Sequence, residues 1–197
     1  MREFEKLDIL AEKGNGFLTT SSVIAESISK TTLAKYIREK NFERVAHGVY
    51  LSPNGWKDEA YIVHLRCPQI VFSHDYALFL HELTDREPLN LTVTLKTGYN
   101  SSRLTADGIK GYTVKSELYP IGITEGLTPF GNAVTVYDLE RTVCDIVRSR
   151  KTVEAQIYRA AMKQYARRED KNLRRLMEYA RLFHIEKVVR EYMEALL

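Results

Sequence analysis

Residues 29–51 read SKTTLAKYIREKNFERVAHGVYL, and they combine the pattern of a helix with that of a β-hairpin. Ser29 can cap the start of the helix, whose apolar residues have the spacing of one buried stripe. These apolar residues are Leu33, Tyr36 and Ile37. From Phe42 onwards the pattern changes to two short strands that meet in a tight turn at Gly48 or just before it. The stretch therefore predicts a helix followed by a hairpin.

Two more helical patterns precede this stretch. Residues 4–13 place their apolar side chains on one helical face, and the sequence Gly-Asn-Gly at 14–16 ends that helix. Thr19 and Thr20 offer hydroxyl groups that can cap a second, shorter helix. Three short helices followed by a hairpin are typical of a winged helix-turn-helix, and we predict this fold for residues 1–60.

The third helix suits the major groove of DNA. A helix that enters the groove needs an apolar face against its support and small polar or basic residues on its other face. Residues 30–44 also carry five Lys or Arg against two Glu, a local charge of +3. The candidate DNA-binding residues in the helix and the hairpin are Lys30, Thr31, Thr32, Lys35, Arg38, Arg44 and His47. The alternative is an ordinary three-helix bundle with a solvated basic face.

A second basic region lies near the end of the chain. The net charge of the whole chain, +3, is too small to indicate a nucleic-acid partner, but residues 140–197 alone carry +5. An additional basic surface is predicted from Arg159, Lys163, Arg167, Arg168, Arg174 and Arg175. These cations either belong to solvated helix faces with pairs along the helix, or they bind a polyanion or a partner protein. Charge alone leaves both interpretations open.

Residues 61–197 are predicted to form a second, mixed α/β domain. Residues 60–83 have a mainly helical pattern with a break at Pro68, and residues 98–111 are typical of a loop. Strands are expected at 89–95, 112–114, 122–124 and 133–137. Helices are expected at about 138–149, 153–167, 171–182 and 185–196. The predicted fold class is α+β, mainly α, with a helical bundle at the end of the chain.

The sequence has no recognisable motif for catalysis or metal binding. His74-Asp75 and His81-Glu82 lie seven residues apart, but neither HxxxH nor HExxH occurs. A nuclease of the acid–acid–lysine type would need a carboxylate two residues before Lys96, where this chain has a threonine. Phosphate-binding loops, the GxGxxG fingerprint and the GxSxG turn do not occur either. We therefore predict that the protein is not an enzyme and binds no metal or cofactor.

The composition predicts a cytoplasmic protein. The apolar runs are only a few residues long, so we expect no membrane span, and the first residues, MREFEK, lack the pattern of a signal peptide. Cys67 and Cys144 have no metal-binding spacing, which fits a reducing compartment.

Three segments resemble the AbiEi-type antitoxins. FERVAHGVY at residues 42–50 resembles the wing of that family, and SHDYALFLHELTD at 73–85 is similar to a stretch that follows it. DLERTVCD at 138–145 resembles a third family segment. The order of the three segments makes the resemblance more specific than each segment alone, and it covers about residues 4–182.

The resemblance implies an antitoxin of a type IV toxin–antitoxin system, which acts in abortive infection as a phage defence of bacteria. Its winged helix would repress the shared operon by binding inverted repeats in the promoter. We expect the protein to be a monomer in solution and to bind these repeats as two copies. Its C-terminal domain, residues 61–197, would neutralise a nucleotidyltransferase-like toxin without forming a stable complex.

Two other functions stay open at this point. The chain could be a stand-alone winged-helix regulator whose C-terminal domain senses a ligand or another protein. It could also be a DNA-processing hydrolase that uses His74, Asp75 and Glu82.

Overall fold

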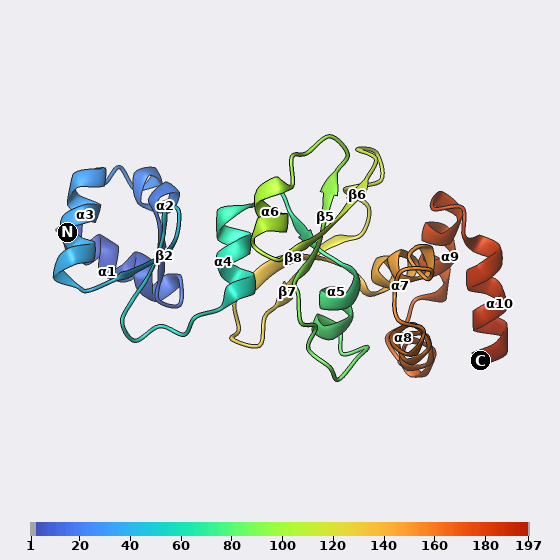
Figure 1. Ribbon diagram of the computed structural model, residues 1–197. Coiled ribbons are helices and arrows are strands. Elements are labelled where there is room, and N and C mark those ends of the chain that lie inside the picture. Colours follow the sequence, from blue (N-terminus) through green and yellow to red (C-terminus); the bar gives the residue numbers. More distant parts are fainter. Residues whose placement is uncertain (1–2, 197) are drawn as a thin grey trace. The chain divides into compact units, whose positions relative to one another are not determined.

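The computed structural model describes residues 3–196, and its chain divides into two units (Figure 1). Unit 1 comprises the described residues up to Pro68 together with the segment Leu127–Ala133. Unit 2 comprises Gln69–Gly126 and the described residues from Val134 onwards. Among the residues of the described range, no helix is both long and apolar enough to cross a membrane.

Unit 1 is a winged helix with a further helix after the hairpin. In chain order its elements are α1 (Glu3–Lys13), β1 (Phe17–Thr19), α2 (Thr20–Ala25), α3 (Lys30–Glu39), β2 (Glu43–Ala46), β3 (Val49–Leu51) and α4 (Glu59–Arg66). The strands form an antiparallel sheet in the order β1-β3-β2. The three predicted helices and the hairpin are confirmed. Strand β1 was not predicted, because its three residues are defined by pairing with β3, which is remote in sequence.

The helices of unit 1 begin where capping side chains were expected. Thr19 Oγ1 accepts a hydrogen bond from Ser22 N at 3.0 Å, and Ser29 Oγ accepts one from Thr32 N at 3.0 Å. These bonds satisfy main-chain donors that the first turn of a helix leaves free. The apolar side chains behind the three helices form one core, made of Leu7, Ala11, Leu18, Val23, Ile28, Leu33 and Tyr36.

Unit 1 extends past the expected domain boundary at residues 60 and 61, which lies inside α4. Asp58 is buried and caps α4 by accepting a hydrogen bond from Tyr61 N at 3.0 Å. The second carboxylate oxygen of Asp58 accepts from Thr128 Oγ1 at 2.6 Å and from Asn132 Nδ2 at 2.8 Å. These bonds make the remote segment 127–133 a part of unit 1, which no local sequence pattern predicts.

Unit 2 is built on a mixed five-stranded sheet in the order β6-β5-β4-β8-β7 (Figure 1). Its strands are β4 (Val71–Phe72), β5 (Thr92–Lys96), β6 (Lys110–Val114), β7 (Ile123–Leu127) and β8 (Ala133–Tyr137). Strand β4 is antiparallel to β5 and parallel to β8, and β5 is parallel to β6. Strand β4 and the short helix α6 (Ser102–Ala106) were not predicted, since β4 has only two residues and α6 lies in a segment with the composition of a loop.

Helices complete unit 2. Helix α5 (His74–Leu80) follows β4, and β8 is followed by α7 (Leu139–Arg148), α8 (Ala155–Arg167), α9 (Leu173–Leu182) and α10 (Glu186–Leu196). The last four confirm the predicted bundle. Helix α7 contacts α5 as well as α8, α9 and α10, so nearly all of its residues are buried. Together with the mixed sheet, the bundle confirms the α+β fold class.

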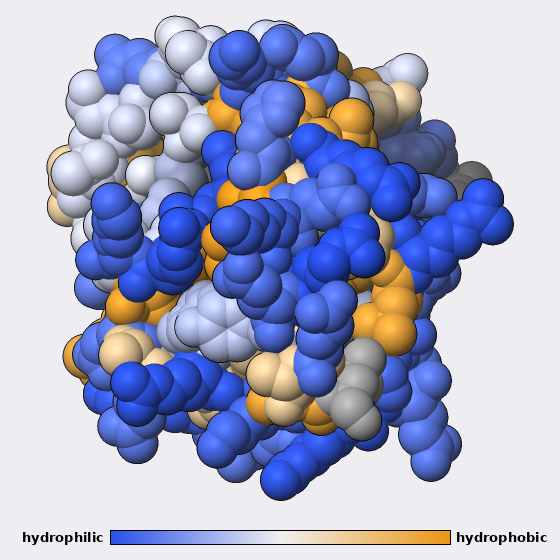
Figure 2. Space-filling model, turned by 90° about the vertical axis from the view of Figure 1, so that its right-hand side faces the viewer, coloured by the Kyte–Doolittle hydropathy of each residue, from blue (hydrophilic) through white to orange (hydrophobic). Residues whose placement is uncertain are grey.

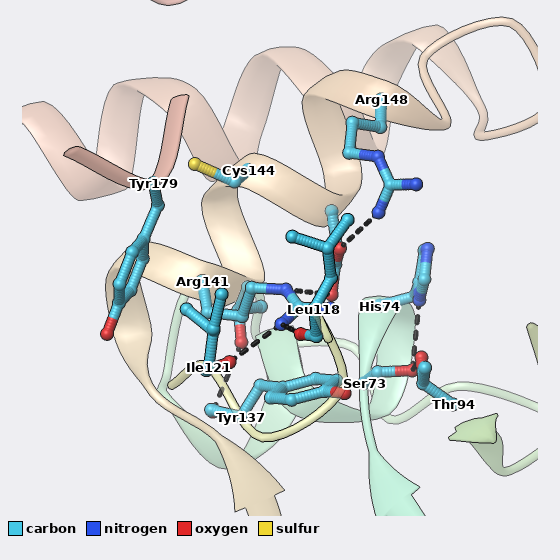
Figure 3. A network of polar contacts seen from close by, with 12 residues as sticks. Ser73, His74, Thr94, Leu118, Ile121, Tyr137, Arg141, Cys144, Arg148 and Tyr179 are labelled. Atoms are coloured by element: carbon cyan, nitrogen blue, oxygen red, sulfur yellow. Dashed lines mark hydrogen bonds and ion pairs between the residues drawn. The ribbon is translucent and has the colours of Figure 1, made fainter. Parts of the chain in front are cut away.

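A fully buried arginine lies at the centre of unit 2 (Figure 3). Arg141 Nε in α7 donates a hydrogen bond to Asp145 Oδ2 at 3.1 Å. Its Nη1 donates to the carbonyl oxygens of Leu118 and Ile121, at 3.0 and 2.7 Å. The guanidinium carbon lies 3.8 Å from the centre of the Tyr137 ring. This network fastens α7 to the segment before β7.

Candidate nucleic-acid interface

Helix α3 has a polar and basic face opposite its buried face. Leu33 and Tyr36 are buried, with 3% and 2% of their surface exposed. Thr31, Lys35 and Arg38 are exposed at helical positions i, i+4 and i+7, with an exposed alanine between them. Lys30 is also exposed, at the start of the helix. Small side chains near the start of a helix can approach base edges, while long cations further along can reach phosphates.

The buried side of α3 is held in place by Tyr36. Its hydroxyl group donates a hydrogen bond to Asp8 Oδ1 in α1 at 2.8 Å, and its ring meets Phe4 edge-on with centroids 5.2 Å apart. Burial and the neighbouring Asp8 carboxylate raise the pKa of Tyr36 above its ordinary value. The contact between α1 and α3 is therefore fixed, and the exposed face of α3 has a defined orientation on unit 1.

The candidate residues of α3 differ in how far they are engaged within the protein. Thr32 is half-buried, and its hydroxyl group donates to Glu3 Oε2 at 3.0 Å. It therefore fastens α3 to α1 before any DNA is present. Lys35 forms an ion pair with Glu39, one turn further along α3, at 3.7 Å. Both side chains are more than half exposed, and such a pair is weak. Arg38 has no ion pair within the described part of the chain.

The hairpin places the two remaining N-terminal candidates on the surface. Arg44 is exposed in β2, opposite Tyr50 of β3. His47 is exposed in the turn, next to Gly48, whose φ of +70° suits glycine. The carbonyl oxygen of Gly48 accepts a hydrogen bond from Thr20 N at 2.8 Å. Because this bond ties the turn to the start of α2, the wing is held relative to the helices.

The predicted additional basic surface separates into two groups. Arg159, Lys163 and Arg167 are exposed on α8 at positions i, i+4 and i+8, so they form one stripe along the helix. No ion pair holds any of these three cations among residues 3–196. We call them the α8 stripe. Their positive charge is not offset locally and is available to a polyanion.

The other three cations of that surface lie within ion-pair distance of carboxylates in unit 2. Arg168 makes two hydrogen bonds to the carboxylate of Asp170, at 2.7 and 2.8 Å. Arg174 pairs with Glu178 at 3.1 Å, but both side chains are more than half exposed, so this pair is as weak as that of Lys35. Arg175 lies 3.9 Å from each of two carboxylates that are more deeply buried. Figure 2, which looks onto the side of the C-terminal helices, shows hydrophilic side chains with hydrophobic ones between them.

Both histidines that suggested a metal site make internal contacts. His74 is buried, with Nδ1 3.0 Å from Ser73 Oγ and Nε2 3.0 Å from Ser149 Oγ. Its ring stacks on Tyr112 with centroids 3.4 Å apart. Burial, and then the nearby cations, lower the pKa of His74 well below its ordinary value, so the ring is neutral. His81 Nε2 lies 2.6 Å from a main-chain carbonyl oxygen of β8.

The structure does not assemble the residues that a metal-dependent hydrolase would need. Among the side chains that the structure describes, no group of three or more His, Cys, Asp and Glu could hold a metal ion. Glu82 is exposed, whereas His74 is enclosed in its own hydrogen bonds. Lys96, the lysine of the nuclease pattern considered in the sequence, lies over the ring of Tyr119, with its ammonium group 5.0 Å from the ring centre.

Comparisons with known proteins bear on each unit differently. Residues 5–53 match the model of a family described as a transcriptional regulator, AbiEi antitoxin. No functionally curated protein matches the chain. The crystal structure of the RV2827C protein from Mycobacterium tuberculosis is similar with a TM-score of 0.56 and 10% sequence identity, over 92% of this chain and 72% of that chain. This likeness covers both units, and at such low identity it shows the fold alone.

Proposed function

We propose that α3 binds operator DNA in the promoter of the chain's own operon, because residues 5–53 match the family model of the AbiEi antitoxin transcriptional regulators. The observation that carries the proposal is the exposed face of α3, where Thr31, Lys35 and Arg38 lie opposite the buried Leu33 and Tyr36. In this arrangement α3 lies in the major groove, and its cations contact the phosphate backbone.

The wing, on unit 1, and the α8 stripe, on unit 2, each add residues that can contact DNA. Arg44 and His47 stand on the hairpin, where they reach phosphates or the neighbouring groove. The α8 stripe adds contacts that depend on charge and carry no sequence preference. We propose that the protein is a monomer in solution and binds as two copies to inverted repeats. Binding of this kind represses transcription from the promoter and involves no catalysis.

Operator binding is tested by fluorescence anisotropy with DNA from the chain's own promoter, against scrambled DNA, at several salt concentrations. Lys35→Ala combined with Arg38→Ala should weaken operator binding about tenfold or more, since two phosphate contacts are lost. The magnitude of the slope of log K against log salt should fall by about 1.8 for each bound copy, because each phosphate contact contributes about 0.9.

The matched control replaces two exposed lysines of unit 1 outside this face, Lys13 and Lys57, with alanine. This control removes the same number of positive charges, so its affinity and salt slope should stay close to those of the natural protein. Equal behaviour of both double variants would contradict the placement of DNA on α3.

We also propose that the C-terminal part of the chain neutralises a nucleotidyltransferase-like toxin without a stable complex. This proposal rests on the resemblance of three sequence segments to AbiEi-type antitoxins. The variant with Lys35→Ala and Arg38→Ala should lose repression in cells and still protect them from the toxin encoded beside it. Loss of protection, with normal protein levels, would show that the two roles are not separate. Co-elution of the two purified proteins in size-exclusion chromatography would contradict neutralisation without a complex.

A further inference from the structure

The start of α3 presents few residues that can reach a base. Its first five residues are Lys30, Thr31, Thr32, Leu33 and Ala34. Leu33 is buried, with 3% of its surface exposed, and Thr32 is half-buried. Lys30, Thr31 and Ala34 are exposed. Because the N-terminal residues of a recognition helix are those that contact base edges, these three residues decide which base pairs α3 prefers.

The two threonines of this turn differ, although they are neighbours in the chain. The hydroxyl group of Thr32 donates a hydrogen bond to Glu3 Oε2 in α1 at 3.0 Å and lies 3.0 Å from Ser29 Oγ. The Thr32 side chain therefore belongs to the contact between α1 and α3. Thr31 is exposed, and its side chain makes no hydrogen bond among residues 3–196. Thr31 is thus available to another molecule, whereas Thr32 is not.

Thr31 and Ala34 place two methyl groups on the exposed face of α3. They stand at positions i and i+3, which lie on one side of a helix with Cβ atoms about 5–6 Å apart. In the major groove, the apolar group that a base pair offers is the C5-methyl group of thymine. Alanine and the methyl group of threonine are side chains that contact it. The two methyl groups therefore fit thymine.

The other side chains of α3 leave few alternatives for reading bases. Residues 30–38 contain no Asn or Gln, which bond adenine, and no Asp or Glu, which accept a hydrogen bond from cytosine. Lys30, Lys35 and Arg38 can bond guanine, or they can bond phosphates, which carry no sequence information. Besides a cation on guanine, the selective contact that this segment offers is the apolar contact to thymine.

We infer that Thr31 and Ala34 read the methyl groups of two thymines in each half-site of the operator. This inference rests on the proposed binding of α3 in the major groove. Base pairs are stacked about 3.4 Å apart along the duplex, so Cβ atoms about 5–6 Å apart span no more than two base steps. The two thymines therefore lie within two base pairs of each other. Thr31 and Ala34 set the sequence preference, and Lys35 and Arg38 supply affinity.

Deoxyuridine tests this contact on the side of the DNA, because it pairs like thymidine and lacks the C5-methyl group. Each thymine of a promoter duplex that carries one half-site is replaced in turn, and the affinity of the full chain is measured by fluorescence anisotropy. Two positions, at most two base pairs apart, should each lose about three- to fivefold in affinity, as expected for one methyl group removed from a contact. Replacement of the other thymines should leave the affinity unchanged.

Variants of the protein assign each thymine to a side chain. Thr31→Ser keeps the hydroxyl group and removes the methyl group, so it should bind thymine and uracil equally at one position. Thr31→Val keeps the methyl group and should retain the difference, and Ala34→Gly should lose it at the other position. The matched control is Thr32→Ser, whose side chain is held by Glu3, and it should retain both differences. The two affinities are compared within each variant, so a general loss of affinity does not affect the result.

The inference and the proposed function fail in different ways. The inference is overturned if the natural protein prefers the promoter duplex to scrambled DNA but no replacement of thymine by uracil weakens binding. It is also overturned if Thr31→Ser keeps both differences between thymine and uracil. Either result leaves the binding of operator DNA by α3 intact. Equal binding to promoter and scrambled DNA contradicts the proposed function itself, and the inference with it.

Discussion

Arginines occur on α3 of unit 1 and on α7 of unit 2, and both helices are amphipathic. On α3 the arginine is exposed to solvent, whereas on α7 Arg141 is buried in the core. Arg38 is exposed, and the described residues include no ion-pair partner for it. Arg141 is fully buried, pairs with Asp145 at 3.1 Å, and lies over the rings of Tyr137 and Phe183. An exposed cation contributes little to the stability of the fold and remains available to a partner. Removal of a buried, paired cation destabilises the fold because its partner charge stays buried, and such a cation is not available to another molecule.

The same contrast divides the surface of the C-terminal helices. Among residues 3–196 no ion pair holds the three cations of the α8 stripe, whereas Arg168, Arg174 and Arg175 lie close to carboxylates. A count of basic residues therefore overestimates the surface that a polyanion can use. The following predictions start with the buried groups, where the expected effects are largest.

Removal of the buried arginine should have the largest effect. Arg141→Ala leaves Asp145 buried with Arg148 as its remaining ion-pair partner among the described residues, and it leaves the carbonyl oxygens of Leu118 and Ile121 without the Arg141 donor. We expect a loss of about 3–5 kcal/mol in the free energy of unfolding, measured by urea denaturation. Arg38→Ala is the matched exposed change and should leave the urea midpoint nearly unchanged. A small effect of Arg141→Ala would show that burial does not distinguish the two arginines.

The buried histidine should make stability depend on pH. The pKa of His74 in the folded chain lies well below 6.5, so the unfolded chain takes up a proton first as the pH falls. Stability should therefore decrease below about pH 6.5 by up to roughly 1.4 kcal/mol per pH unit. Asparagine tolerates the positive φ at this position and has no titrating side chain. His74→Asn should therefore flatten this part of the pH profile, although the variant loses the stacking on Tyr112.

The exposed His47 of the wing provides the control for this experiment. His47→Asn removes one exposed histidine, and its pH profile is the reference against which the flattening by His74→Asn is judged. Parallel profiles for His74→Asn and the natural protein would mean that His74 does not titrate differently in the folded and unfolded chains.

The α8 stripe should give the smallest effect, and only on binding. Replacement of Arg159, Lys163 and Arg167 by alanine should weaken operator binding about three- to tenfold and lower the salt slope, with little change in stability. The comparison is Arg168 and Arg175, whose ion pairs include less exposed side chains, and their replacement should change the salt slope less. If both sets of variants change the slope equally, the distinction between free and paired surface cations fails.

Local sequence patterns predicted most of the helices correctly. Ser29 and Thr19 cap helices where expected, and the stripe of Leu33 and Tyr36 is buried as expected. The four helices of the C-terminal bundle also match their predicted ranges closely. Caps and apolar stripes act over three to seven residues, so the sequence contains this information in one place. The resemblance to AbiEi-type antitoxins was recognisable for the same reason, since each of the three segments that carry it is short, and residues 5–53 match the family model.

Features that depend on remote partners could not be predicted. The short strands β1 and β4 exist because other strands pair with them, and the extension of unit 1 exists because Asp58 binds Thr128 and Asn132.

The sequence by itself determined the winged helix, the basic face of α3 and the helical end of the chain, because these follow from local spacing. Only the tertiary structure decided which cations are free, because an ion pair or a buried position depends on residues brought together from elsewhere in the chain. It placed Arg141 in the core and left the α8 stripe exposed.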